Sequence, residues 1–359
     1  MHTVSIARVM LLEHPKHEGN GLMDTGNLLA HLAWNFCAHP ENIATKSLGF
    51  VLNQNEPARK ALSEFLAGFN VAVSADLEFV GQDVSDEGSI LDLVGRDSSK
   101  DLRLIIEGKF WAGLTANQPV NYLKLLGRSG VLLFVVPTVR MDSVWVEILQ
   151  RAAAHKPIPM LDSKVLAAVT KNGQVLVVAG WSHLLGHIGA GLKDGHLANM
   201  AQLIGLCDCF EREGERKVIS IPAAKSIDTL EKTLIHACPD KSPWNRYRRT
   251  GYVTFRRKGG AMTEVFKVDL VVKFQPWSKY IPTGVSEPVR QRLADYIEWR
   301  RRDWPFGTEG PYTFYVLSEN RIPLPHHPTQ RCQGHCYFTL DELRSGTLHP
   351  RIAKAVETV

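Results

Sequence analysis

The spacing of apolar residues predicts helices in the first part of the chain. Apolar residues between positions 28 and 34 share one face of a first helix, whose N-cap is expected at Asp24 or Thr25. Pro40 suits the first turn of a second helix, because the N–H that proline lacks has no helical partner there. Asn55 is the expected cap of a third helix, which ends near Gly68.

From about residue 71 the pattern becomes that of strands. Residues 89–94 and 102–107 are rich in Ile, Leu and Val, and the polar turn 96–101 (RDSSKD) separates them, which predicts an antiparallel hairpin. The uninterrupted apolar run 131–136 predicts a fully buried strand. Together with the helices, these strands predict an α/β layer built on a mixed sheet.

Further helices and a hairpin complete this first half. Helices are expected over 117–126, over 143–154, after Trp181 and over 198–213, with a hairpin turning at 171–173. The charged run 211–217 is the expected domain boundary, so we predict one domain over 1–215 and another over 216–359. Strands over 252–255, 265–272 and 312–317 and a helix over 289–301 predict an α+β fold for the second domain.

Composition narrows the class of protein only a little. The 359 residues are 44% hydrophobic and 22% charged, with a formal net charge of +5, which is compatible with nucleic-acid binding without requiring it. No apolar run approaches the roughly 20 residues that span a bilayer, and no export signal opens the chain. We therefore expect no membrane partner, a cytoplasmic location and six reduced cysteines.

The predicted hairpin carries a group of charged residues with a recognisable chemistry. Glu107 and Lys109 are two positions apart on one strand, so their side chains leave the same face. Asp92 lies on the preceding strand, where hairpin pairing brings it near Glu107. Two converging carboxylates make an oxygen site suited to Mg²⁺ or Mn²⁺, and a neighbouring lysine can orient water or stabilise a phosphorane.

The run 105–119 (IIEGKFWAGLTANQP), with Asp92 in LDLVG, resembles the PD-(D/E)XK nuclease superfamily, and residues 201–207 (AQLIGLC) resemble the closing helix of one subfamily. The resemblance covers about residues 35 to 213 and implies a restriction-endonuclease-like mixed sheet flanked by helices. It also implies catalytic or pocket roles for Glu41 and Gln118. Two positions depart from the family pattern: Leu91 stands where proline is frequent, and Gly108 where alanine or a larger residue is common.

Each assignment has an alternative that involves no catalysis. Asp92, Glu107 and Lys109 could instead be solvated charges of a hairpin that form an exposed cross-strand ion pair. Their apolar neighbours, however, place them near buried surface. Asp101 is a rival to Asp92 but falls in the polar turn. The alternative for Glu41 is that its negative charge only stabilises the positive N-terminal end of its helix. The alternative for Gln118 is that it only caps the helix that follows it.

Two further clusters have candidate functions. A basic and aromatic stretch is a candidate nucleic-acid contact, with charged edge strands as the alternative; its cations are Arg246, Arg248, Arg249, Arg256, Arg257 and Lys258. A second stretch holds residue types that ligate zinc, but it lacks a regularly spaced partner cluster; its members are His326, His327, Cys332, His335 and Cys336.

The sequence therefore predicts a Mg²⁺-dependent nuclease, with DNA as the substrate that the resemblance favours and with Mn²⁺ able to substitute. Asp92 and Glu107 would bind the metal, and Lys109 would act on water. One alternative is a catalytically silent nucleic-acid-binding or scaffold module. Another is a prokaryotic defence effector with the same chemistry, in which the second domain senses a signal. A homo-oligomer and an activating partner both stay open.

Overall fold

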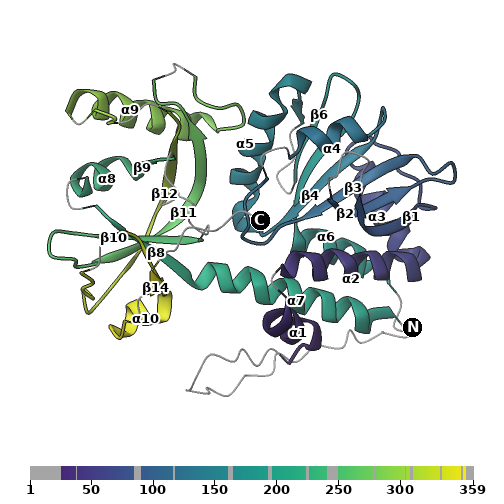
Figure 1. Cartoon of the computed structure of the whole chain (residues 1–359), viewed down its shortest axis with the longest axis horizontal. Coiled ribbons are helices and arrows are strands. Elements are labelled where there is room, and N and C mark those ends of the chain that lie inside the picture. The colour runs from purple at the N-terminus through teal and green to yellow at the C-terminus, as the bar shows by residue number, and fades with distance from the viewer. Residues whose placement is uncertain are drawn as a thin grey trace, which may run out of the picture.

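The chain folds into two mixed α/β parts, each built on its own sheet (Figure 1). The computed structural model describes residues 26–37, 39–84, 90–115, 118–160, 165–192, 196–223, 226–240, 250–277, 280–303, 305–307, 310–331, 334–348 and 351–352. Within these residues, no helix is both long and apolar enough to cross a membrane.

The first sheet has seven described strands and mixed pairing. In spatial order they are β1 (Glu78–Val84), β2 (Ile90–Arg96), β3 (Leu102–Gly108), β4 (Val131–Val136), β7 (Val175–Gly180), β6 (Leu166–Val169) and β5 (Ile158–Met160). Strands β3, β4 and β7 run parallel, and the remaining neighbours pair antiparallel. The predicted hairpins at 89–107 and around 171–173 are confirmed, as is the buried strand at 131–136.

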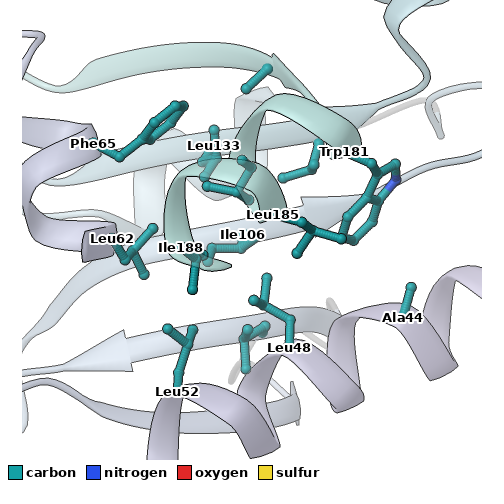
Figure 2. Close-up of a cluster of buried hydrophobic side chains, with 14 of the residues drawn as sticks. Ala44, Leu48, Leu52, Leu62, Phe65, Ile106, Leu133, Trp181, Leu185 and Ile188 are labelled. Atoms are coloured by element: carbon teal, nitrogen blue, oxygen red, sulfur yellow. The ribbon is translucent and has the colours of Figure 1, made fainter. Parts of the chain in front are cut away.

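Helices cover both faces of this sheet. One face packs against α1 (Leu28–Phe36), α2 (Pro40–Gln54), α3 (Glu56–Ala67), α6 (Trp181–Ala190) and α7 (Leu197–Arg216). Figure 2 shows part of that core, where leucines of α2 and α3 meet Ile106 and Leu133 of the sheet beneath α6. The other face packs against α4 (Val120–Leu125) and α5 (Met141–Arg151). The short 3-10 helix η1 (Thr138–Arg140) directly precedes α5, and η2 (Ala152–His155) directly follows it.

The expected cap of α1 is wrong, whereas Asn55 is confirmed as the N-cap residue of α3, without a side-chain cap hydrogen bond. Asp24 and Thr25 lie outside the described residues, and the N-cap of α1 is Asn27, whose side chain accepts a hydrogen bond from the Ala30 N–H at 2.9 Å. Asn55 does occupy the position before α3, but its side chain donates to the Val51 carbonyl at 2.7 Å instead of capping. The Asn55 amide is thus bonded to the last turns of α2 and not to the first turn of α3.

The second sheet also contains seven described strands. Their order is β14 (Arg351–Ile352), β13 (Cys336–Thr339), β8 (Lys217–Pro222), β10 (Tyr252–Arg256), β11 (Glu264–Phe274), β12 (Tyr312–Pro323) and β9 (Ile235–Pro239). Only one described pairing, β8 with β10, is parallel. The helices are α8 (Ile227–Thr233), α9 (Glu287–Asp303) and α10 (Leu340–Ser345).

The two parts are joined without a linker. Helix α7 ends at Arg216 and β8 begins at Lys217, so the charged run 211–217 forms the last turns of a helix and the first residue of a strand. The two parts also contact each other through α5, which lies between the two sheets and packs against β11 (Figure 1).

Candidate active site

The β2–β3 hairpin brings two acidic residues face to face. Leu93 pairs with Ile106 and Val94 with Ile105, so one further step along the register sets Asp92 opposite Glu107. The Gly108 N–H donates to Asp92 Oδ2 at 3.0 Å. Both carboxylates are buried, with 8% of Asp92 and 1% of Glu107 exposed, so neither is part of an exposed surface ion pair.

Polar side chains contact both oxygens of Glu107. Lys109 Nζ lies 2.6 Å from Oε1, as their two-residue spacing at the strand end predicts. Gln118 Nε2 donates to the same oxygen at 2.8 Å, and Tyr122 OH donates to Oε2 at 3.1 Å. These contacts fix the orientation of the Glu107 carboxylate. Gln118 is 5% exposed and does not cap α4, whose N-cap is Pro119 and has no side-chain cap hydrogen bond.

Glu41 reaches the site from α2, which covers the face of the sheet opposite to the one that α4 covers. Its Oε1 accepts a hydrogen bond from the Phe110 N–H at 3.4 Å, and its charge acts on both Asp92 and Lys109. Although Glu41 does lie in the first turn of α2, only 9% of it is exposed. The structure thus brings together the five residues predicted for the site.

The cluster carries more negative than positive charge. Burial, then the charge of Glu107, raises the pKa of Asp92 to about 7, although the Lys109 ammonium and the Gly108 N–H oppose the rise. Burial by itself would lower the pKa of Lys109, but Glu107 and Asp92 outweigh it and the pKa is raised. Lys109 is therefore a cation at neutral pH, and an added cation would relieve the repulsion among the carboxylates.

Gly108 is required where the site passes between two helices. A Cβ built at this position would lie 2.6 Å from Thr45 Cγ2 of α2 and 2.9 Å from the Trp181 ring of α6. Both neighbours are buried, with 1% and 0% exposed. The glycine at this position therefore has a steric cause.

Sequence reasoning missed or undervalued three residues. Tyr122 lies in α4, four residues after Gln118, and its hydroxyl accepts a hydrogen bond from Gln118 Nε2 at 2.6 Å, a short spacing that was visible in the sequence. Arg140 donates to the carbonyls of Phe110 and Ala112, and Arg151 donates to those of Leu114, Thr115 and Gln118. These arginines hold the segment that follows β3, and no local pattern around them signals that role.

Other residues of the hairpin and of the segment after it have different contacts. Asp101, the rival to Asp92, is exposed in the turn and pairs with Arg103 at 3.2 Å. Trp111 is a packing residue, as its indole N–H donates to the Phe210 carbonyl at 2.7 Å and its ring covers Gly214 of α7. Asn117 lies outside the described residues.

The cations predicted to contact nucleic acid have different surroundings in the structure. Arg246, Arg248 and Arg249 lie outside the described residues. Arg256 is 3% exposed and donates to the Gly334 carbonyl and, at 3.5 Å, to Cys336 Sγ, so its expected surface role is wrong. Arg257 forms an ion pair with Glu231, and Lys258 is exposed.

The described residues include no group of three or more His, Cys, Asp or Glu side chains arranged to hold a metal ion. Cys332 lies outside them, and the zinc candidates within them, His326, His327, His335 and Cys336, form no such group. Mg²⁺ has a smaller requirement, because it commonly binds one or two carboxylates and completes its shell with water and phosphate oxygens. The buried, negatively charged pair Asp92 and Glu107 fits that requirement.

Comparison with known proteins yields little. No protein-family model matches the chain, and no curated protein matches it. The structures found are ASCH from Zymomonas mobilis, with a TM-score of 0.20, 19% identity and coverage of 36% of this chain and 92% of that one, and mutants of it. One mutant has a TM-score of 0.22, 18% identity and coverage of 37% and 95%. A likeness this weak carries no argument about fold or function.

Proposed function

We propose that the protein is a metal-dependent nuclease of the PD-(D/E)XK type and that its first sheet belongs to the restriction-endonuclease-like class. The supporting observation is the buried pair Asp92 and Glu107, opposite each other on a hairpin, with Lys109 Nζ 2.6 Å from Glu107. Burying two carboxylates costs free energy unless cations compensate their charge. A bound metal ion would supply such a cation.

Each residue has a distinct role in this proposal. Asp92 and Glu107 would hold Mg²⁺, which when bound supplies a more acidic water and neutralises charge on the phosphate. Lys109 would orient the attacking water or stabilise negative charge on the phosphoryl oxygens. Gln118 and Tyr122 keep Glu107 in position, and Glu41 holds the Phe110 N–H beside the site. Attack of water on phosphorus breaks one P–O bond, and the leaving oxygen takes up a proton.

DNA is the proposed substrate because the sequence resemblance favours it. The second sheet would recognise the substrate, a partner or a regulatory ligand. A defence role is compatible with the same chemistry and requires an activity that rises with a partner or signal.

Cleavage of supercoiled plasmid and of single-stranded DNA, in Mg²⁺, in Mn²⁺ and in EDTA, tests the proposal. Wild type is compared with Asp92→Asn, with Lys109→Ala and with Asp101→Asn, a matched acidic control from the exposed turn. We expect cutting only with metal, a loss of at least about 100-fold in the two site variants, and wild-type rates in the control.

Other outcomes would redirect the assignment. Cutting that survives in Asp92→Asn and Lys109→Ala would contradict the site. DNA binding without cutting, under every metal condition, would favour the silent binding module.

A further inference from the structure

Helix α5 contacts three different parts of the molecule. On one face, Val144 and Ile148 belong to the core under the first sheet. On a second face, Ser143, Val146 and Gln150 recur at intervals of three and four residues, the spacing of neighbours on one side of a helix.

This second face is where the second sheet docks. Ser143 Oγ accepts a hydrogen bond from the Val271 N–H at 2.9 Å, and Gln150 Nε2 donates to the Lys273 carbonyl at 2.9 Å. Between them Val146, which is 1% exposed, belongs to the hydrophobic core of the second sheet. A residue of the first part therefore completes the core of the second.

The third face holds the segment between β3 and α4. Arg140, directly before α5, donates to the carbonyls of Phe110 and, at 2.9 Å, of Ala112. Arg151, the last residue of α5, donates to the Gln118 carbonyl at 3.2 Å and to the Thr115 carbonyl. The two guanidinium groups grip the segment near both of its ends.

The held segment carries a residue that orients the site. The Gln118 side chain accepts a hydrogen bond from the Thr115 N–H at 3.1 Å and donates to Glu107 at 2.8 Å. The backbone of Gln118 and Thr115 is what Arg151 binds. A shift of Arg151 would therefore move the amide that orients the Glu107 carboxylate.

We propose that Arg151 is a positioning residue for Glu107 and that docking of the second sheet on α5 keeps Arg151 in place. The inference rests on the proposed function, because it concerns the metal-binding orientation of Glu107. It makes the second sheet part of the assembly of the site, so a ligand that altered its docking on α5 would alter metal affinity.

Arginine is suited to this position in a way that lysine is not. Besides the carbonyls of Leu114, Thr115 and Gln118, the guanidinium of Arg151 pairs with Glu147 at 2.6 Å. Guanidinium presents five donors in a rigid plane, whereas an ammonium has three donors on a flexible stem. Arg151→Lys thus keeps the charge and the ion pair but loses part of the grip.

The test measures two quantities in the full chain. Mn²⁺ affinity, from electron paramagnetic resonance of free Mn²⁺, reports the orientation of Glu107. Amide hydrogen exchange of residues 110–115 reports the held segment. Arg151→Ala and Arg151→Lys are compared with Arg103→Ala, a control arginine that pairs with Asp97 and Asp101 at the far end of the hairpin.

We expect Mn²⁺ affinity to fall about 10- to 100-fold in Arg151→Ala and less in Arg151→Lys, with faster exchange over 110–115. Arg103→Ala should match wild type in both quantities. Val146→Ala, and more strongly Val146→Lys, should weaken Mn²⁺ binding without touching the segment directly. The milder variant keeps the test valid if the lysine prevents folding.

Each result bears on a different claim. Folded Arg151→Ala with wild-type exchange over 110–115 would overturn the inference, as would Val146 variants with loosened docking and wild-type Mn²⁺ affinity. Wild type that binds no Mn²⁺ would instead contradict the proposed function. The exchange data would still decide whether Arg151 holds the segment.

Discussion

Gly108→Ala is the substitution whose effect the structure predicts most closely. The added Cβ would lie 2.6 Å from Thr45 Cγ2 and 2.9 Å from Trp181 Cζ2, and contacts under 3.0 Å do not occur at real Cβ atoms. Neither neighbour is the free end of a flexible side chain, since both are buried. Overpacking of this kind costs about 1–3 kcal/mol. The strand end between Glu107 and Lys109 would shift, so metal affinity should fall as well.

A double-mutant cycle with Thr45→Ser isolates the steric cause. Serine removes Cγ2 but keeps the hydroxyl that donates to the Glu41 carbonyl at 3.0 Å. Deleting one buried methyl costs about 0.5–1.5 kcal/mol alone, but in the Gly108→Ala background it should recover part of the loss. The Trp181 contact persists, so the rescue is incomplete. The assay is urea unfolding followed by circular dichroism, compared across the four proteins.

A Gly108→Ala variant as stable as wild type would refute this steric cause, because α2 and α6 would then not approach β3 so closely. Free-energy changes of the two substitutions that add within about 0.5 kcal/mol would refute it as well. Additivity would locate the cost of alanine away from Thr45.

Three further predictions concern other parts of the chain. In Gly214→Ala, the new Cβ would overlap the Trp111 ring, so a loss of about 1–3 kcal/mol and altered tryptophan fluorescence are expected; an unchanged unfolding midpoint would argue against the packing of Trp111 on α7. In EDTA, the free energy of unfolding should fall as the pH rises from about 4 to 7, since Asp92 holds its proton up to a pKa of about 7 in the folded protein but releases it near 3.8 when unfolded; the slope is at most about 1.4 kcal/mol per pH unit, and Asp92→Asn should show a flatter profile by the same denaturation assay. Asn27→Ala should cost about 1 kcal/mol through loss of the α1 cap, whereas a thermal unfolding curve that superimposes on wild type would show that the cap contributes nothing.

Features with a local cause were predictable from the sequence. The apolar run 131–136 has the bounds of β4, because an uninterrupted apolar run bounded by glycine and proline leaves little freedom in assignment. The β2–β3 hairpin follows from two segments rich in Ile, Leu and Val and a polar turn, and its register, continued by one step, sets Asp92 opposite Glu107. The core of the candidate site was therefore within reach of local rules.

Features that depend on distant parts of the chain were not predictable in this way. The Phe110 N–H meets Glu41 from 69 positions away, and only the family resemblance suggested Glu41. Arg151 grips Thr115 across 36 positions, a contact that depends on where α5 packs. The prediction of the α1 N-cap was wrong for a related reason. Asn27, the observed N-cap, also donates to the Gln202 carbonyl of α7 at 2.9 Å, a contact between distant parts of the chain.

The most direct test of the central claim is the rate of plasmid nicking as a function of Mg²⁺ concentration, for wild type, Asp92→Asn and Asp101→Asn. The account predicts nicking that rises with Mg²⁺ and saturates in wild type and in Asp101→Asn, and that is reduced at least about 100-fold in Asp92→Asn. Equal Mg²⁺-dependent nicking by Asp92→Asn and wild type would contradict it.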